Sequence, residues 1–196
     1  MATNRIKIKQ ITSGGQIYGK HLIADGNSGF TFSDAIEKGT TFPSNPTGGD
    51  VYYRTDVDAL FHYDDSRSKW FTVKTLLYSC GRNSIIRSTS AYMYAGNAVQ
   101  SSTNGFIMTY NGTILAATVD NVNVMALPRD VEFRVNNSTT NKVTLTIPAS
   151  SKSASTITAN QDFSSGDTIQ VIGISTPVGG TTLSNVIATF EIGWRI

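Results

Sequence analysis

Short runs in which apolar and polar residues alternate recur along most of the chain, and this period of two predicts β-strands. In the segment VEFRV, Val131, Phe133 and Val135 are expected to face a core. Glu132 and Arg134 alternate with them and are expected to face outward. The pattern therefore indicates strands with one buried and one solvated face.

The C-terminal two thirds of the chain consist of such strands separated by polar turns. The predicted strands cover 91–95, 106–110, 112–119, 131–135, 142–147, 168–175 and 186–196. Many short strands at regular spacing are typical of a β-sandwich or jelly roll. No long helical period appears, which argues against parallel α/β folds. We expect an all-β protein in which residues 74–196 form an antiparallel jelly-roll sandwich.

Residues 42–73 predict a small three-stranded β-meander. The segments DVYYRT, LFHYD and WFTV have the β-branched and aromatic content of strands, and the turns DVDA and DSRSK separate them. Phe61 and Tyr63 are expected on one face, and Leu60 and His62 on the other. Because strands of about five residues make a meander marginal alone, it is expected to dock on another part of the protein.

Residues 1–41 read as an extended arm. RIKIKQI alternates Ile6 and Ile8 with Lys7 and Lys9, and glycine-rich turns follow it. The region lacks the apolar content for a core of its own, so it is expected to lie on another domain or chain. A short helix over 33–38 is predicted, with a serine cap and a glycine stop.

The last strand runs to the final residue with an alternating pattern. A strand at a chain end frays unless it is paired or buried, so this one is expected to be paired on both sides or to pack against another subunit. Its polar face carries Thr189, Glu191 and Arg195, which could pair between copies around an axis. The strand therefore favours an oligomer.

Composition narrows the function classes. Charged residues make up 15% of the chain, below the usual level of about 25%, and the net charge is +2. Bulk charge therefore predicts no nucleic-acid partner. The single cysteine, Cys80, is expected to be a buried thiol, and neither a secretory signal nor an apolar run long enough for a membrane span is visible. Synthesis in a reducing cytoplasm is expected.

Three kinds of catalytic or ligand chemistry are conceivable, each with a simpler alternative. Cys80 and His62 could form a nucleophile–base pair, although His62 fits an ordinary meander position. The aspartates of 56–65 could act as paired carboxylates or bind Ca²⁺. Aspartate is equally typical of tight turns, which is the interpretation we favour, and we expect no catalytic residue, metal or cofactor. The glycines form no phosphate-binding loop.

The aromatic residues of 42–73 could stack on sugars or on a partner protein. Half of them are needed to fill the meander's own small core. The remainder would make a docking patch, and docking on the chain's own sandwich is the simplest explanation.

FPSNPTGGDVYYRTDVDALFHYDDSRSKW resembles a module common in virion proteins of tailed bacteriophages, especially fibres and other surface proteins. The resemblance covers about a sixth of the chain. It is carried by Pro46, Gly49, Asp50, Tyr52, Tyr53, Arg54, Thr55, Asp56, Leu60, Phe61, Tyr63, Asp64 and Trp70.

The remainder is similar to the trimeric jelly-roll group that includes complement heads, tumour necrosis factor and phage head fibres. The similarity is carried by SAYMYAGNAVQSSTNGFIMTYNGTILAATV and the closing ATFEIGWRI, while Thr109 and Tyr110 depart from a proline common at that turn. It implies a homotrimer with the C-terminal strand near the threefold axis. The expected trimer interface is Phe190, Ile192, Trp194 and Ile196.

The resemblances imply a non-enzymatic structural protein of the virion surface. The leading hypothesis is a trimeric capsid decoration, or head-fibre, protein that binds the major capsid protein. Its anchoring arm would consist of Arg5, Ile6, Lys7, Ile8, Lys9 and Ile11. The first alternative is a short tail fibre that plugs into a baseplate protein and reads a host surface glycan with loops 97–105 and 175–185. The second is a glycan depolymerase that uses Asp58 and Asp64.

Overall fold

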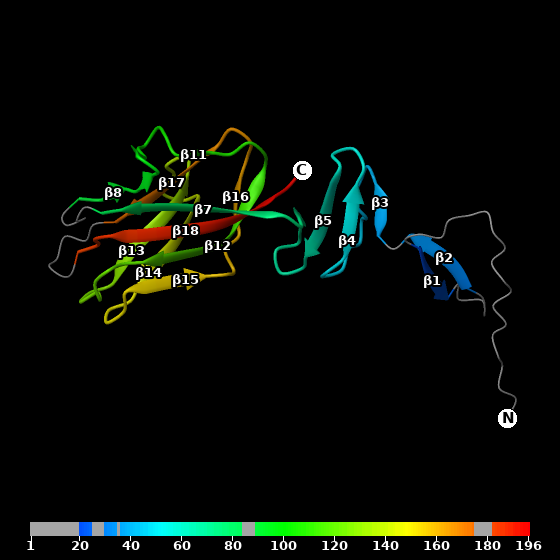
Figure 1. The fold of residues 1–196 in the computed structure, drawn as a ribbon, viewed down its shortest axis with the longest axis horizontal. Coiled ribbons are helices and arrows are strands. Elements are labelled where there is room, and N and C mark those ends of the chain that lie inside the picture. The colour runs from blue at the N-terminus through cyan, green and yellow to red at the C-terminus, as the bar shows by residue number, and fades with distance from the viewer. Residues whose placement is uncertain (1–19, 25–29, 35, 84–88, 175–181) are drawn as a thin grey trace, which may run out of the picture.

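In the part of the chain that the structure describes, the regular elements are all β-strands (Figure 1). The computed structural model describes residues 20–24, 30–34, 36–83, 89–174 and 182–196. Within these residues the chain forms four sheets, and nearly all strand pairs are antiparallel. The all-β fold class is therefore confirmed. Among the described residues there is no helix that could cross a membrane.

The predicted helix over 33–38 is wrong. A hairpin precedes the meander, and the meander's sheet takes a fourth strand from the segment expected to be arm. The strands are β1 (Lys20–Ala24), β2 (Phe30–Asp34), β3 (Glu37–Gly39), β4 (Val51–Arg54), β5 (Ala59–Asp64) and β6 (Lys69–Thr72). A helix of six residues makes too few hydrogen bonds to offset the unfavourable free energy of helix nucleation. As a strand, β3 instead forms a parallel hydrogen-bonded ladder with β4.

The first sheet of the sandwich has the order β10-β9-β7-β18-β12-β15, and β16 also pairs with β12. The last long strand therefore lies between the first and the middle one. Its strands are β7 (Thr75–Arg82), β9 (Tyr94–Ala95), β10 (Ala98–Val99), β12 (Gly112–Asp120), β15 (Ser153–Thr156), β16 (Gln161–Phe163) and β18 (Val186–Trp194).

The second sheet has the order β11-β17-β13-β14, and β8 also pairs with β17. Its strands are β8 (Ala91–Tyr92), β11 (Phe106–Ile107), β13 (Arg129–Val135), β14 (Lys142–Ile147) and β17 (Thr168–Gly173). The strands predicted over 131–135, 142–147 and 168–175 are present at the expected places, and the β13–β17 ladder is in continuous register. The strand predicted over 106–110 shortens to β11, and the one predicted over 91–95 is divided between β8 in this sheet and β9 in the first.

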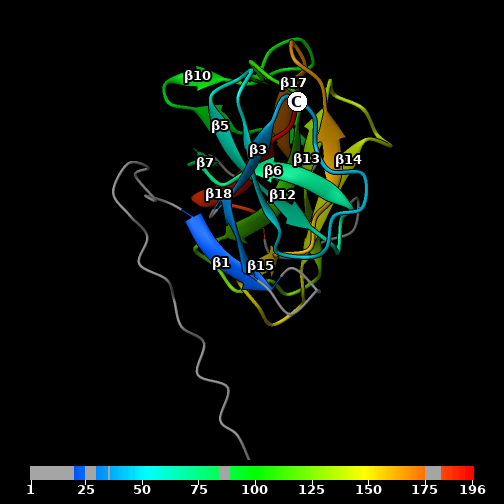
Figure 2. The same cartoon turned by 90° about the vertical axis from the view of Figure 1, so that its right-hand side faces the viewer.

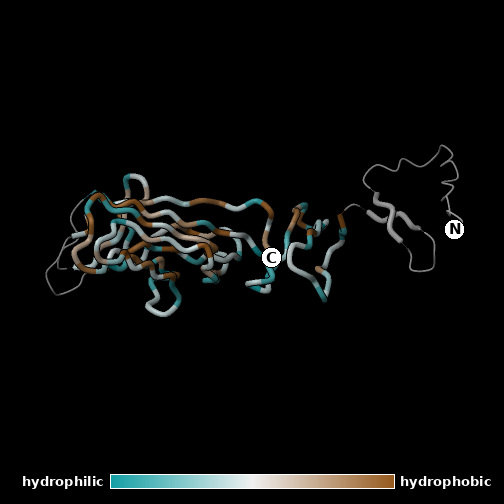
Figure 3. The backbone as a smooth tube through the Cα atoms, turned by 90° about the horizontal axis from the view of Figure 1, so that it is seen from below, coloured by the Kyte–Doolittle hydropathy of each residue, from teal (hydrophilic) through white to brown (hydrophobic). Residues whose placement is uncertain are grey.

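The core lies between the two sandwich sheets. Val131 and Phe133 are fully buried in it and Val135 is almost so, as their alternation predicts. Phe190 of β18 stacks on Tyr78 with ring centroids 5.2 Å apart and meets Phe133 edge-on at 5.7 Å. Such pairs add to the free energy gained by burial. Brown, apolar stretches lie along the sandwich strands in Figure 3.

The meander sits at one end of the sandwich, and the chain's C-terminus lies beside it (Figure 1). Viewed along the long axis, the meander strands cover that end of the sandwich (Figure 2). The protein is therefore elongated, with the meander between the sandwich and the β1–β2 hairpin.

Glu132 faces outward from β13 as its alternation predicts, yet only 6% of the residue is exposed. Its carboxylate accepts hydrogen bonds from Arg134, at 2.6 Å, and from Lys142. Arg134 also donates to the side chain of Asn137. On the outer face of the second sheet, Glu132, Arg134 and Lys142 thus form ion pairs within one chain.

Acid should weaken the fold through Glu132. Burial by itself would raise the pKa of the Glu132 carboxyl, but hydrogen bonds from Lys142 and Arg134 hold this pKa below the usual 4.5. A carboxyl whose pKa is lower in the folded chain than in the unfolded one stabilises the fold at neutral pH, and this stabilisation is lost as pH falls through the folded pKa. Denaturant titrations should therefore show the free energy of unfolding falling below pH 4.5.

Glu132→Gln should be less stable than the wild type at pH 7, and the difference should shrink at acid pH because glutamine has no proton to gain. Glu37→Gln on the exposed strand β3 is the control. An equal loss of stability with acid in the wild type and in Glu132→Gln would contradict this role of Glu132.

Candidate functional site

The aspartates of the meander serve its turns. Asp50 accepts hydrogen bonds from the backbone N–H and the hydroxyl of Thr47, both at 2.8 Å. Asp56 pairs with Arg54 at 2.7 Å, and this hydrogen bond lowers the pKa of the Asp56 carboxyl. Asp58 has a φ of +52°, a turn conformation that aspartate tolerates. These carboxylates are committed to local structure, as the turn interpretation expects.

Asp64 is the carboxylate with the most partners in the meander. It accepts hydrogen bonds from Ser66 at 2.6 Å, from the backbone N–H of Arg67 at 3.1 Å and from the Arg67 guanidinium. Burial by itself would raise the pKa of the Asp64 carboxyl, but these hydrogen bonds hold this pKa below the usual range. A general acid needs a raised pKa, so the geometry runs against the depolymerase hypothesis at Asp64.

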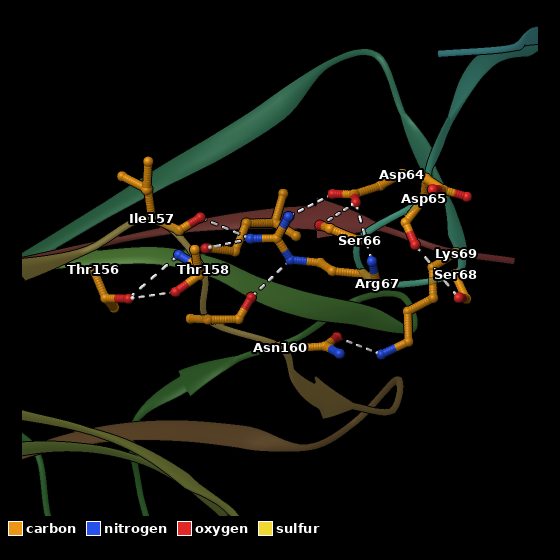
Figure 4. A network of polar contacts seen from close by, with 12 residues as sticks. Asp64, Asp65, Ser66, Arg67, Ser68, Lys69, Thr156, Ile157, Thr158 and Asn160 are labelled. Atoms are coloured by element: carbon orange, nitrogen blue, oxygen red, sulfur yellow. Dashed lines mark hydrogen bonds and ion pairs between the residues drawn. The ribbon is translucent and has the colours of Figure 1, made fainter. Parts of the chain in front are cut away.

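Arg67 carries the contact between the meander and the sandwich. Its guanidinium donates to the backbone carbonyls of Leu115 at 2.9 Å, Ile157 at 2.8 Å and Ala159 at 2.8 Å (Figure 4). Only 12% of the side chain is exposed, and Asp64 holds it from behind. The rigid fork of arginine suits several acceptors at once, which the single ammonium of lysine does not.

The position of Arg67 follows from a break in the β12 ladder. β16 pairs with β12 up to Ile114, β15 pairs with it from Ala117 onward, and the β12–β18 register shifts at the same place. Carbonyls at such a break lose their strand partners and need other donors. Arg67 supplies them, so the meander completes the hydrogen bonding of the sandwich.

A second polar contact lies beside the first. Lys69 donates to the side chains of Asn160 at 2.6 Å and Asp162 at 2.7 Å. Asp162 also accepts from Thr113 at 2.6 Å and lies 3.5 Å from Arg195. Burial by itself would raise the pKa of the Asp162 carboxyl, but these donors lower it below its usual value. We call the contacts of Arg67 and Lys69 with the sandwich the joint.

An apolar contact closes the joint. Phe71 of β6 is fully buried and lies over Gly193 of β18 next to Leu115. A Cβ at position 193 would come within 2.9 Å of both side chains. Glycine therefore lets the meander approach the sheet closely.

Gly193→Ala should destabilise the protein by about 1–3 kcal/mol, because its methyl group overfills the contact between Phe71 and Leu115. Thermal unfolding measures the effect. Gly49→Ala, where an added methyl group meets nothing but the backbone has a φ of +91°, shows the cost of backbone strain alone. A Gly193→Ala protein as stable as the wild type would contradict the close approach.

The other face of the meander carries a small aromatic core. Phe42 stacks on Trp70 with centroids 4.8 Å apart and meets Phe61 edge-on at 5.1 Å. Tyr52 packs against both Phe42 and Trp70. The aromatics thus divide between a core and a docking contact with the chain's own sandwich, as the sequence indicates.

The prediction of a trimer interface at Phe190 and Ile192 is wrong. Both side chains are fully buried in the core of the single sandwich, so they have no surface to offer another chain. Trp194 is half-buried against Phe163 and Tyr110. The exposed Ile196 stays a predicted interface residue, as does the accessible part of Trp194.

The opposite face of the same sheet, which we call the neutral face, is exposed and has few charges. Leu77 of β7 is 71% exposed and Ile187 of β18 is 58% exposed. Between and beside them lie small or uncharged residues together with two acids: Ser79, Ala116, Thr118, Asp120, Thr189 and Glu191. Because Leu77 and Ile187 are this exposed, their side chains contribute little hydrophobic stabilisation to the single chain. No pattern in the sequence distinguishes these two residues.

The remaining candidate residues are not brought into one site. The predicted anchoring residues, from Arg5 to Ile11, lie outside the described residues. His62 lies in the meander and Cys80 toward the far end of β7 (Figure 1). Burial raises the pKa of the Cys80 thiol to about 12, so a nucleophilic thiolate is disfavoured. In the described part of the chain no three His, Cys, Asp or Glu side chains gather in a way that could hold a metal ion.

Comparisons with protein families, curated proteins and solved structures find no match to this chain.

Proposed function

We propose that the chain is a non-enzymatic structural protein of a tailed-phage virion, a homotrimeric capsid decoration protein. The joint is the observation that carries the proposal. It fixes the meander, whose sequence resembles phage virion modules, to the end of the sandwich through Arg67 and Lys69. A projecting surface protein needs such a rigid connection between its attachment end and its outer domain.

The strand order supports a jelly-roll reading of the sandwich. β7 lies beside β18, the first long strand beside the last, and β12 takes strands from later in the chain on its other side. Two facing antiparallel sheets joined in this way are typical of jelly rolls, which occur in viral surface proteins.

The neutral face supports self-association. Burying Leu77 and Ile187 against copies of the chain would contribute up to about 1.5–3 kcal/mol of favourable free energy for each side chain. The two acids of the face, Asp120 and Glu191, would then lie near the interface and would need partners from the neighbouring copy. This arrangement keeps β18 close to the proposed threefold axis through the face opposite to Phe190.

The attachment of the arm to the capsid is tested by co-sedimentation. Purified protein should sediment with capsids of the phage that encodes it, and Lys7→Glu with Lys9→Glu should abolish this binding, because the basic charges proposed to contact the capsid are reversed. Lys152→Glu on the sandwich is the control. Wild-type protein that binds isolated tails and leaves capsids in the supernatant would overturn the decoration role in favour of a tail fibre.

A further inference from the structure

A pocket of about 500 Å³ lies on the first sandwich sheet, where β9 meets one end of β7. This end of β7 is the one remote from the meander (Figure 1). Its lining residues are Cys80, Gly81, Asn83, Tyr94, Gly96 and Asn97. The volume falls in the range of small-molecule sites, which is about 300–1,000 Å³. It lies apart from the joint.

A tight hairpin builds one wall of this pocket. β9 and β10 pair through Ala95 and Ala98, which leaves Gly96 and Asn97 as a two-residue turn. Gly96 has a φ of +59°, as the first position of a type II′ turn requires. The turn places Asn97 in the lining. A Cβ added at Gly96 would meet nothing within 4 Å, whereas one at Gly81 would come within 2.8 Å of the Val186 carbonyl oxygen, so Gly81 allows the close approach of β18.

The aromatic side of the pocket is held in place from behind. The Arg82 guanidinium lies 5.3 Å from the ring centroid of Tyr94 and donates to the carbonyl of Tyr92 at 2.7 Å. The half-buried tyrosine ring is therefore fixed before any ligand arrives, which lowers the entropy lost on binding.

The polar groups of this pocket are available to a ligand. The amides of Asn83 and Asn97 and the hydroxyl of Tyr94 have no hydrogen-bond partner among the described residues. The polar pocket at the other end of the sandwich differs, because its Asn136 and Asp167 bond to each other at 2.7 Å. Two amides and a phenol offer donors and acceptors that match vicinal hydroxyl groups.

We propose that this pocket binds a neutral saccharide unit, with the Tyr94 ring against the sugar and Asn83 and Asn97 bonding its hydroxyl groups. Among the described residues that line the pocket there is no aspartate, glutamate, lysine, arginine or histidine, and the nearby Arg82 is engaged with the Tyr94 ring and the Tyr92 carbonyl, so the lining favours an uncharged ligand. The mixed polar and aromatic lining suits a sugar better than an apolar ligand. Saccharide binding goes beyond the capsid role and does not depend on it.

Saturation-transfer NMR tests the proposal with free glucose, galactose, mannose, N-acetylglucosamine and N-acetylgalactosamine. At least one of them should receive signal from the protein at millimolar concentration. Tyr94→Ala and Asn97→Ala should each weaken its binding by about tenfold, as expected for one lost contact. Tyr110→Ala, which removes a 65% exposed tyrosine at the other end of the sandwich, should bind as the wild type does.

Two results would overturn the proposal: no transfer to any of the five sugars, or equal binding by Asn97→Ala and the wild type. Asn97 lies in an exposed turn, so its variant keeps the fold even if Tyr94→Ala does not. Co-sedimentation with capsids should be unchanged in Asn97→Ala, which separates a failure of this proposal from a failure of the capsid role.

Discussion

Replacing Arg67 with alanine should lower the free energy of unfolding by about 3 kcal/mol and release the meander from the sandwich. The variant leaves the carbonyls of Leu115, Ile157 and Ala159 without their donor and Asp64 without its cation. Buried polar groups that lose their partners cost about 1–3 kcal/mol each, reduced here wherever water can enter. Denaturant titration measures the loss, and limited proteolysis should find new cuts between residues 54 and 74.

Two variants separate the geometry of Arg67 from its charge. Arg67→Lys keeps the charge but lacks the fork, so it should recover less than half of the lost stability. Arg54→Ala removes an arginine that pairs with Asp56 and covers Phe42 inside the meander. It should leave the proteolysis pattern of the sandwich boundary unchanged. Arg67→Ala with wild-type stability and wild-type cleavage would show that the joint does not hold the two units together.

Introducing aspartate at both Leu77 and Ile187 should abolish the proposed trimer and leave a monomer. Each wild-type side chain is more than half exposed in the single chain, so the change costs little within the monomer, about 0.5 kcal/mol. In an assembly it would place new charges beside Asp120 and Glu191, where like charges repel. Light scattering should give three times the 21.1 kDa chain mass for the wild type and a single chain mass for the variant.

Ile107→Asp is the matched control, because Ile107 is 68% exposed on β11 of the other sheet. It should stay trimeric. If the variant with both aspartates has the same mass as the wild type, the neutral face is not the interface. A wild type with the mass of a single chain would contradict the trimer itself.

Alternation along the chain was sufficient to predict the long strands of the sandwich. Val131 and Phe133 of β13 and the apolar row of β18 are buried where the period of two places them. One face of each of these strands packs against the facing sheet and the other does not, so the alternation of apolar and polar residues is strong. The meander was predictable for a related reason, since its turns contain the glycine and aspartate that tight turns demand.

Strands without alternation could not be found in this way. β7 carries Leu76 toward the core and Leu77 toward solvent, so its apolar run has no period. β15 and β16 consist mostly of small and polar residues, and they are strands because β12 offers them a ladder. Their formation depends on a partner distant in sequence, which local propensity does not report.

The error about Phe190 and Ile192 has the same origin. Alternation in β18 separates two faces, but it does not say whether the apolar face meets a second sheet or a second chain. The sheet formed by β13, β14 and β17 covers it. Arg67 was missed because its function depends on a ladder break near Leu115 that no pattern around residue 67 reveals.

The number of copies in each virion tests the central proposal most directly. Purified particles of the phage that encodes the chain can be digested and quantified by mass spectrometry against an isotope-labelled standard of the protein. A capsid decoration protein should be present in hundreds of copies for each particle, in fixed ratio to the major capsid protein. A handful of copies in fixed ratio to a baseplate protein, or absence from washed virions, would contradict it.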